Sequence, residues 1–283
     1  MRRALLLAYF GLAALLLAAC ATQLAEAPPS ERQPAGGKTL VFQQKSLAPA
    51  SGERAITAGD LRTGDILLSA EASLRSSGIR IVTLAPVSHA AIYLGDAQVA
   101  EALGGGVGLR SLPAMLAEES VIAVYRHPRV DAALGERIAA KARERVGRGY
   151  DFVGALMYVP FSAQRQACEL PALPTPLREA CIGLLASVQL GVREPESRFF
   201  CSAFVLDAYR DAGLPLTQAR ARWLTPADIL HMREGDVPAL PVEQPLVYVG
   251  HLKTTPWAME LPAFQLLLPP GYPIPVMPRP LVP

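Results

Sequence analysis

The order of its short apolar segments constrains the fold of this 283-residue chain more than any other feature. Four segments that are rich in apolar or β-branched residues and bordered by turn residues predict strands at residues 65–69, 88–94, 98–102 and 121–125. Clear helical patterns begin only after these strands, and strands and helices do not alternate regularly. This order predicts an α+β domain built around an antiparallel sheet.

Three helices and a last strand are expected downstream. Apolar residues at helical spacing predict one helix over 131–146 and a second over 199–212. Thr225 as N-cap and Pro226 at the first helical position predict the start of a third. Residues 246–249 complete the predicted domain as a strand.

Residues 1–19 have the organisation of an export signal. Arg2 and Arg3 precede an apolar run from residue 4 to residue 19, which ends directly before Cys20. A short transmembrane anchor is the alternative, although the run falls short of the roughly 20 residues that span a bilayer.

The small pair before Cys20 resembles the lipobox of bacterial lipoproteins. That resemblance implies that Cys20 becomes the first residue of the mature chain and carries lipid, palmitate included. No Asp stands at the second position, where Ala21 follows Cys20. By resemblance to sorting in bacteria with two membranes, this implies the periplasmic face of the outer membrane within the cell envelope.

The remaining organisation follows from composition. Residues 20–55 are polar, contain several prolines and glycines and lack periodicity, so we expect a tether from the lipid to the domain, or alternatively an arm packed on it. The domain is expected over 56–257. Within it, residues 160–196 contain five prolines and two cysteines and are interpreted as an insertion or lid. Residues 258–283 are rich in proline and form a tail.

Charge excludes one class of partner. Removing Arg2 and Arg3 from the 27 basic residues leaves 25, which equals the number of acidic residues. Nucleic-acid binding requires a basic footprint, so we expect no nucleic-acid partner. The glycine-rich segment 104–108 lacks the Lys and Ser/Thr of a phosphate loop.

The cysteines divide into three groups. Cys20 is the expected lipid site, and Cys201 stands alone. Cys168 and Cys181 lie thirteen positions apart, and export to an oxidising compartment favours a disulfide between them over two buried thiols.

Cys201 is the candidate nucleophile, because a helical apolar pattern begins at this residue. The unpaired N–H groups and the dipole at a helix start favour a thiolate, which attacks carbonyl groups when an imidazole lies beside it. A buried structural cysteine is the alternative.

His89 is the candidate partner. It lies in the apolar segment 86–94, where a lone histidine is also readily a satisfied core residue. His127, His231 and His251 lie in a predicted turn, near a helix end and after the last strand. No two histidines have the spacing of zinc ligands, so we expect neither a metal site nor a cofactor.

Glu101 is the only acid on the strand that follows His89 and is the candidate for orienting the imidazole. A solvated strand charge is the alternative. A hairpin centred on Gly95 would place Glu101 directly opposite His89. We then expect both side chains to meet Cys201 in one cleft, with the Cys201 helix packed on the same face of the sheet.

Five segments in order carry a family resemblance: residues 61–68, 87–93, 99–102, 149–152 and 200–205. Together they resemble the circularly permuted papain-like amidases of the YaeF/YiiX type, relatives of the NlpC-like cysteine peptidases. In that family the strand bearing the histidine precedes the helix bearing the cysteine, which is the reverse of papain.

The resemblance covers roughly residues 56–232. It implies a circularly permuted papain-like fold with Cys201 as nucleophile, His89 as base and Glu101 as orienting group. It also implies that Tyr150 lies near the site and contacts substrate, although a core tyrosine with a solvated hydroxyl is equally consistent.

The expected activity is thiol-dependent hydrolysis of amide bonds in the cell envelope, with peptidoglycan peptides as the substrate that the location indicates. Two alternatives stay open. One is a lipid acyl hydrolase or acyltransferase that uses the same Cys–His pair, and the other is a non-catalytic binding module.

Overall fold

The computed structural model describes residues 22–26, 38–44, 46–49, 52–83, 85–150, 161–162, 164–169, 173–189 and 198–254. The expected export signal, Cys20 and the proline-rich tail lie outside these residues. The described elements, in chain order, are β1 (Thr22–Glu26), β2 (Lys38–Phe42), η1 (Ala58–Asp60), β3 (Ile66–Glu71), α2 (Leu74–Thr83), β4 (His89–Tyr93), β5 (Gln98–Leu103), β6 (Gly106–Ser111), α3 (Leu112–Glu118), β7 (Glu119–Arg126), α4 (Ala132–Arg143), β8 (Gly149–Tyr150), η2 (Gln166–Glu169), α6 (Thr175–Gln189), β9 (Arg198–Phe199), α7 (Cys201–Asp211), η3 (Ala221–Trp223), α8 (Pro226–His231) and β10 (Val247–Lys253).

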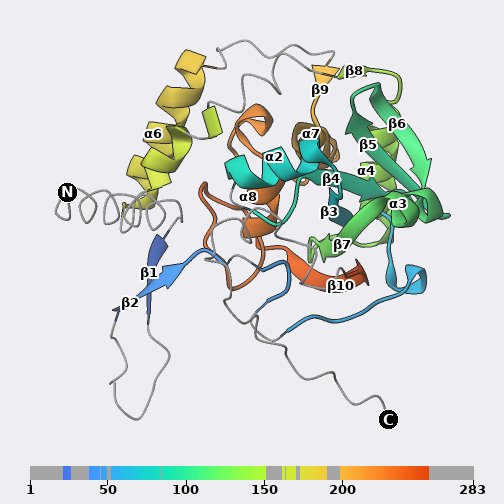
Figure 1. Cartoon of the computed structure of the whole chain (residues 1–283), viewed down its shortest axis with the longest axis horizontal. Coiled ribbons are helices and arrows are strands. Elements are labelled where there is room, and N and C mark those ends of the chain that lie inside the picture. Colours follow the sequence, from blue (N-terminus) through green and yellow to red (C-terminus); the bar gives the residue numbers. More distant parts are fainter. Residues whose placement is uncertain are drawn as a thin grey trace, which may run out of the picture. The chain divides into compact units, whose positions relative to one another are not determined.

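A six-stranded sheet in the order β10-β7-β3-β4-β5-β6 forms the centre of the domain (Figure 1). Every pair of neighbours in it is antiparallel. The α+β class predicted from the order of apolar segments is therefore confirmed, and the four predicted strands correspond to β3, β4, β5 and β7.

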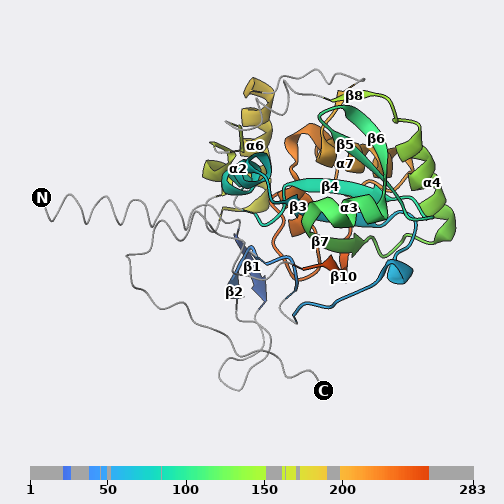
Figure 2. The ribbon, with the colours of Figure 1, turned by 45° about the vertical axis from the view of Figure 1, so that its right-hand side comes forward.

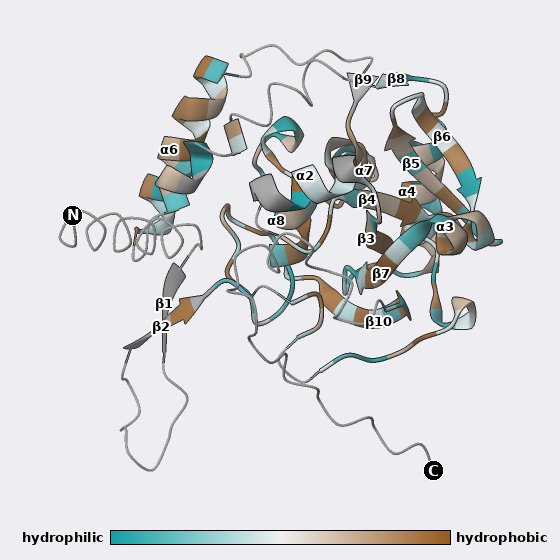
Figure 3. Ribbon diagram, viewed as in Figure 1, coloured by the Kyte–Doolittle hydropathy of each residue, from teal (hydrophilic) through white to brown (hydrophobic). Residues whose placement is uncertain are grey.

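Both faces of the sheet pack into apolar cores, which explains why its central strands are largely hydrophobic. Helices lie on both sides of the sheet in Figure 2, and hydrophobic residues recur along its strands in Figure 3. The larger core cluster joins alternate residues such as Ala90 and Ala100 to Phe204 of α7 and Ile138 of α4. The smaller cluster lies on the opposite face.

That smaller cluster joins Ala91 and Val99 to Leu112 and Met115 of α3. β4 and β5 therefore contribute successive residues to two different cores.

Sequence patterns missed several elements. The sequence pattern did not predict β6, because the strand contains Gly106 and Gly108 and only its first residues are buried. α2 contains Gly78 and two serines, which weaken a helical pattern.

The turn between β4 and β5 differs from the expected one. Ala91, not His89, lies opposite Glu101, so the hairpin is centred on Asp96 instead of Gly95. Gly95, Asp96 and Ala97 form the loop with φ values of 85°, 49° and 54°. The predicted register was wrong by two positions on one strand. Because side chains alternate with a period of two, His89 and Glu101 still share a face.

Part of the N-terminal segment packs against the domain. β1 and β2 pair antiparallel, with Thr22 opposite Phe42. Directly after β2, Gln43 is buried and its Nε2 donates to the carbonyl of Val237 at 3.1 Å. Leu47 is buried in the main core, and its carbonyl accepts from Arg233 Nη1 at 2.6 Å. Gln43 and Leu47 therefore fit the alternative, an arm packed on the domain.

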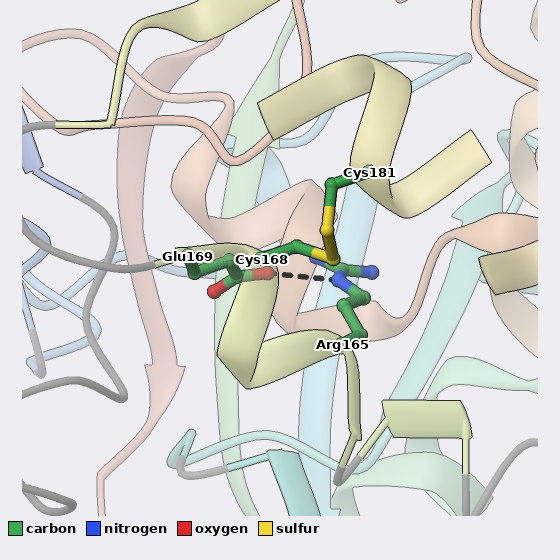
Figure 4. The surroundings of a disulfide bond; sticks show 4 residues. All are labelled: Arg165, Cys168, Glu169 and Cys181. Carbon is green, nitrogen blue, oxygen red and sulfur yellow. Dashed lines mark hydrogen bonds and ion pairs between the residues drawn. A yellow bond between two sulfur atoms is a disulfide. The ribbon is translucent and has the colours of Figure 1, made fainter. Parts of the chain in front are cut away.

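The expected insertion contains η2 and α6, joined by a disulfide between Cys168 and Cys181 with a Cα–Cα distance of 5.6 Å (Figure 4). Arg165 beside it lies in a buried ion-pair cluster. Its Nε lies 2.8 Å from Glu169 Oε1, and its Nη1 lies 2.9 Å from Asp228 Oδ2 at the start of α8. The described part of this segment is thus fastened to the body of the domain.

Replacing Leu47 by Ala tests whether the arm belongs to the cooperative fold. The free energy of unfolding is expected to fall by about 2–5 kcal/mol, the cost of truncating a core leucine. Urea denaturation of the full chain measures it. Leu109 of β6, which is 48% exposed, provides the matched control, and Leu109→Ala is expected to change stability by less than about 0.5 kcal/mol. Equal small effects of both substitutions would show that the arm is not part of the folding unit.

Candidate active site

Cys201 is the first residue of α7, directly after the N-cap Phe200. It is a free cysteine, 8% exposed. The first hydrogen bond of the helix runs from the N–H of Phe204 to the carbonyl of Phe200 at 2.9 Å. The N–H groups of the first turn precede that ladder, so the thiol lies at the positive end of the helix dipole, where negative charge is stabilised.

His89 and Glu101 form a short, buried contact on the sheet. His89 Nε2 lies 2.7 Å from Glu101 Oε2, and the two residues are 8% and 3% exposed. Since Nε2 is engaged by the carboxylate, Nδ1 is the ring nitrogen left for another partner.

Arg110 of β6 lies on the other side of the carboxylate. Its Nε is 2.7 Å from Glu101 Oε1, and its Nη2 donates to Oε2 at 3.0 Å. The same guanidinium also contacts Glu118 at 2.7 Å and Glu119 at 3.2 Å. Sequence analysis missed Arg110, because it lies on the strand that glycines concealed.

The charges follow from these contacts. Burial lowers the pKa of His89, but the hydrogen bonds and charges of Cys201 and Glu101 outweigh it and raise the pKa to about 10. Burial likewise raises the pKa of Glu101, while His89 and Arg110 hold it below its ordinary value. At neutral pH the site therefore contains an imidazolium and a carboxylate.

The expected packing of the Cys201 helix was wrong in one respect. Glu101 lies opposite Ala91, which belongs to the core under α3, whereas α7 packs on the face that carries Ala90 and Ala100. The side chains of His89 and Glu101 therefore point to the face of the sheet opposite α7. His89 is the first residue of β4 and Cys201 is the first of α7, so the two meet at the end of the sheet.

A pocket lies at this end of the sheet. His89, Cys201 and Tyr150 line it together with Ser76 and Ile79 of α2, Ser88, Ala102, Leu103, Glu71 and Glu119. Its volume is about 490 Å³ when the part open to solvent is included. Tyr150 of β8 is half-buried and borders the same space as the thiol and the imidazole, as the resemblance implied.

The other histidines are engaged elsewhere. His231 Nδ1 lies 3.0 Å from Asp236 Oδ2, His251 contacts Tyr248, and His127 Nδ1 accepts from the N–H of Arg129. Within the part of the chain that the structure describes, no three His, Cys, Asp or Glu residues gather in a group that could hold a metal ion. None of the described helices is long and apolar enough to cross a membrane.

This fold and site define a class of protein. The family profile described as "Permuted papain-like amidase enzyme, YaeF/YiiX, C92 family" matches residues 60–158, which include His89, Glu101 and Tyr150 but not Cys201. The chain belongs to this family, and it is a cysteine hydrolase of the amidase or peptidase kind.

The family membership rests mainly on one curated relative. The "Probable lipoprotein peptidase YaeF" of Escherichia coli (strain K12) is 40% identical over an alignment of 244 residues, which covers 84% of this chain and 89% of that protein. The solved structure described as metalloprotein yiiX from Escherichia coli O157:H7 is 19% identical, with a TM-score of 0.40 over 56% of this chain and 71% of that one.

The pKa of His89 provides a direct test of the site. Its ring is expected to titrate with a midpoint at about 10 instead of the 6.5 of a free histidine, as measured from its NMR signals. The pKa of His89 is therefore higher in the folded protein than in the unfolded chain. The charged pair therefore contributes fully to stability below pH about 6.5, and this contribution is lost as the pH rises through about 10.

Glu101→Gln removes one group that raises this pKa, so the midpoint is expected to move down. Glu118→Gln is the matched control, since Glu118 is exposed and contacts Arg110 but not His89. A midpoint near 6.5 in the unmodified protein, or one that Glu101→Gln leaves in place, would contradict the described coupling.

Proposed function

We propose that Cys201, His89 and Glu101 form a catalytic triad that hydrolyses amide bonds through a thioester. The observation that carries the proposal is the 2.7 Å contact of His89 Nε2 with Glu101, with Cys201 and His89 lining one pocket. A buried imidazole fixed by a carboxylate on one nitrogen can exchange a proton with the thiol through the other.

The reaction follows from these positions. The Cys201 thiolate attacks the carbonyl carbon, and the imidazolium of His89 protonates the departing amine nitrogen as the C–N bond breaks. Water then attacks the thioester while His89 accepts one of its protons. The C–S bond breaks, the acid product leaves, and the thiolate–imidazolium pair is restored.

Two further groups have proposed roles. The backbone N–H of Cys201, in the first turn of α7, donates to the oxyanion that forms on the attacked carbonyl. Tyr150 lines the same pocket and contacts substrate there.

The proposed substrate is a peptide of the cell envelope, such as a peptidoglycan stem peptide. The export signal expected in residues 1–19 and the lipoprotein named as a relative support this location. We propose that Cys20 carries the lipid and that the anchor holds the domain at the periplasmic face of the outer membrane.

Triad substitutions test the chemistry. Cys201→Ala is expected to lower kcat by at least about 10³-fold on a muropeptide substrate. Glu101→Gln is expected to lower kcat by on the order of 10²–10⁴-fold, because the imidazole loses its orienting acceptor. Glu118→Gln should retain kcat within a few-fold. Muropeptides and acyl lipids are compared in parallel, and turnover of the lipids alone would replace amides with lipid esters as the substrate class.

Iodoacetamide separates an activated thiol from an ordinary one without any substrate. Cys201 should react faster in the parent than in His89→Ala at neutral pH, as followed by mass spectrometry. Equal rates that match a free thiol would remove His89 from the catalytic role.

Processing of the N-terminus tests the anchor. Globomycin, which blocks cleavage of lipoprotein signals, is expected to cause an uncleaved precursor to accumulate, visible as a larger band on gels. Cys20→Ser should leave the protein without lipid. A Cys20→Ser protein that is still cleaved and retained in the membrane fraction would contradict lipid attachment at this residue.

A further inference from the structure

The outer side of α6 presents a narrow apolar stripe. Leu177, Leu184 and Val188 are 59%, 70% and 76% exposed. At about 100° per residue, their positions fall within roughly 40° of arc on one side of the helix. Among the described residues only two other large hydrophobic side chains are exposed, Leu109 at 48% and Val146 at 42%.

The stripe lies on a helix that is poor in charge. The charged residues of α6 are Arg178 and Glu179. Arg178 is 1% exposed and donates from Nη1 to the carbonyl of Pro238 at 3.2 Å, so it faces the domain. Glu179 is therefore the one exposed charge on this helix, and hydrophobic residues recur along it in Figure 3.

The helix is held so that the stripe stays outward. Ile182 and Ala186, on the opposite side from the stripe, are fully buried in the main core. The disulfide fixes Cys181 to η2, and the ring of Trp223 lies close against Gly183. The stripe of Leu177, Leu184 and Val188 therefore belongs to an ordered surface, and contiguous exposed apolar surface marks interaction sites.

The N-terminal arm enters the domain beside this helix. Gln43, which follows β2, bonds the carbonyl of Val237, and Arg178 of α6 bonds the carbonyl of the next residue, Pro238. Cys20 is also close to Gln43 along the chain and across the strand pair. It stands two residues before Thr22, and Thr22 pairs with Phe42, the residue before Gln43. The Cα atoms of Cys20 and Gln43 can therefore lie at most about 17 Å apart, the sum of three steps along the chain and one spacing between paired strands.

We propose that the stripe of Leu177, Leu184 and Val188 docks into the interfacial layer of the phospholipid bilayer that holds the lipid anchor. The inference rests on lipid attachment at Cys20 and is independent of the catalytic triad. The short connection brings the membrane surface to the side of the domain where α6 lies, and the stripe offers that surface apolar side chains with little competing charge.

The docking gives the anchor a second contact, and acyl chains together with a protein surface bind more firmly than either alone. Because the stripe lacks basic residues, the contact should be insensitive to salt, unlike the binding of a polybasic segment to anionic lipid.

The test uses the full, lipidated chain in vesicles of phosphatidylethanolamine and phosphatidylglycerol that contain a phospholipid with a photoactivatable diazirine in its acyl chain. Irradiation should cross-link lipid to the peptide containing residues 175–189, as mapped by mass spectrometry. Leu184→Glu with Val188→Glu is expected to reduce this cross-linking at least about tenfold, since two apolar contacts are replaced by charges. Leu109→Glu is the matched control and should leave it unchanged.

Each outcome decides the proposal. Lipid cross-links absent from α6 in the parent, or equally reduced by Leu109→Glu, would overturn it even though lipid attachment stands. Self-association of the Cys20→Ser protein in ultracentrifugation that Leu184→Glu abolishes would assign the stripe to a second copy of the chain instead. The rate of Cys201 alkylation should be the same in all variants, which verifies folding and keeps this result separate from that of the triad.

Discussion

The carboxylate of Glu101 lies between two cationic groups, and the polar end of the sheet is arranged around it. His89 approaches one oxygen from β4, and Arg110 reaches both oxygens from β6. A buried carboxylate is costly to ionise unless such partners are present, and here the two strands on either side of β5 provide them. The strand pairing that builds the sheet therefore also fixes the direction of the His89 ring. Arg110 in turn links this carboxylate to Glu119, which borders the pocket.

The site lies at the end of a sheet whose two faces are both occupied by core. α7 covers one face and α3 the other. The first residues of β4 and α7 meet where both cores end. The start of α7 brings the Cys201 thiol and the positive end of the helix dipole to the His89 imidazole at the start of β4. This arrangement requires no gap in the packing of either core.

The class of fold was accessible from sequence because it depends on local signals, and local signals also made His89, Glu101 and Cys201 candidates. His89 and Glu101 stand on strands with clear apolar patterns, and Cys201 stands where a helical pattern begins. The register of the hairpin could not be predicted from the sequence. It depends on a loop of three residues with positive φ, and one of them is Ala97, a residue type that rarely adopts this conformation. Nor was the packing of Gln43 and Leu47 foreseeable, because their partners lie 194 and 186 positions away and a polar, proline-rich flank resembles a linker. Arg110 was not predicted as a site residue, because no local sequence pattern distinguishes a solvent-exposed arginine on a strand from one that pairs with a buried acid.

Asp228 connects α8 to the inserted segment, so that changes in one of these parts during evolution affect the other. One of its oxygens caps α8 by accepting from Thr225, and both oxygens bond the guanidinium of Arg165 from the inserted segment. A lineage that lost the insertion would retain a carboxylate buried without its counter-charge, at a cost of about 3–5 kcal/mol. Loss of the segment and replacement of Asp228 are therefore expected to occur together among relatives. A relative with Asp at this position but without the insertion must carry a different cation there.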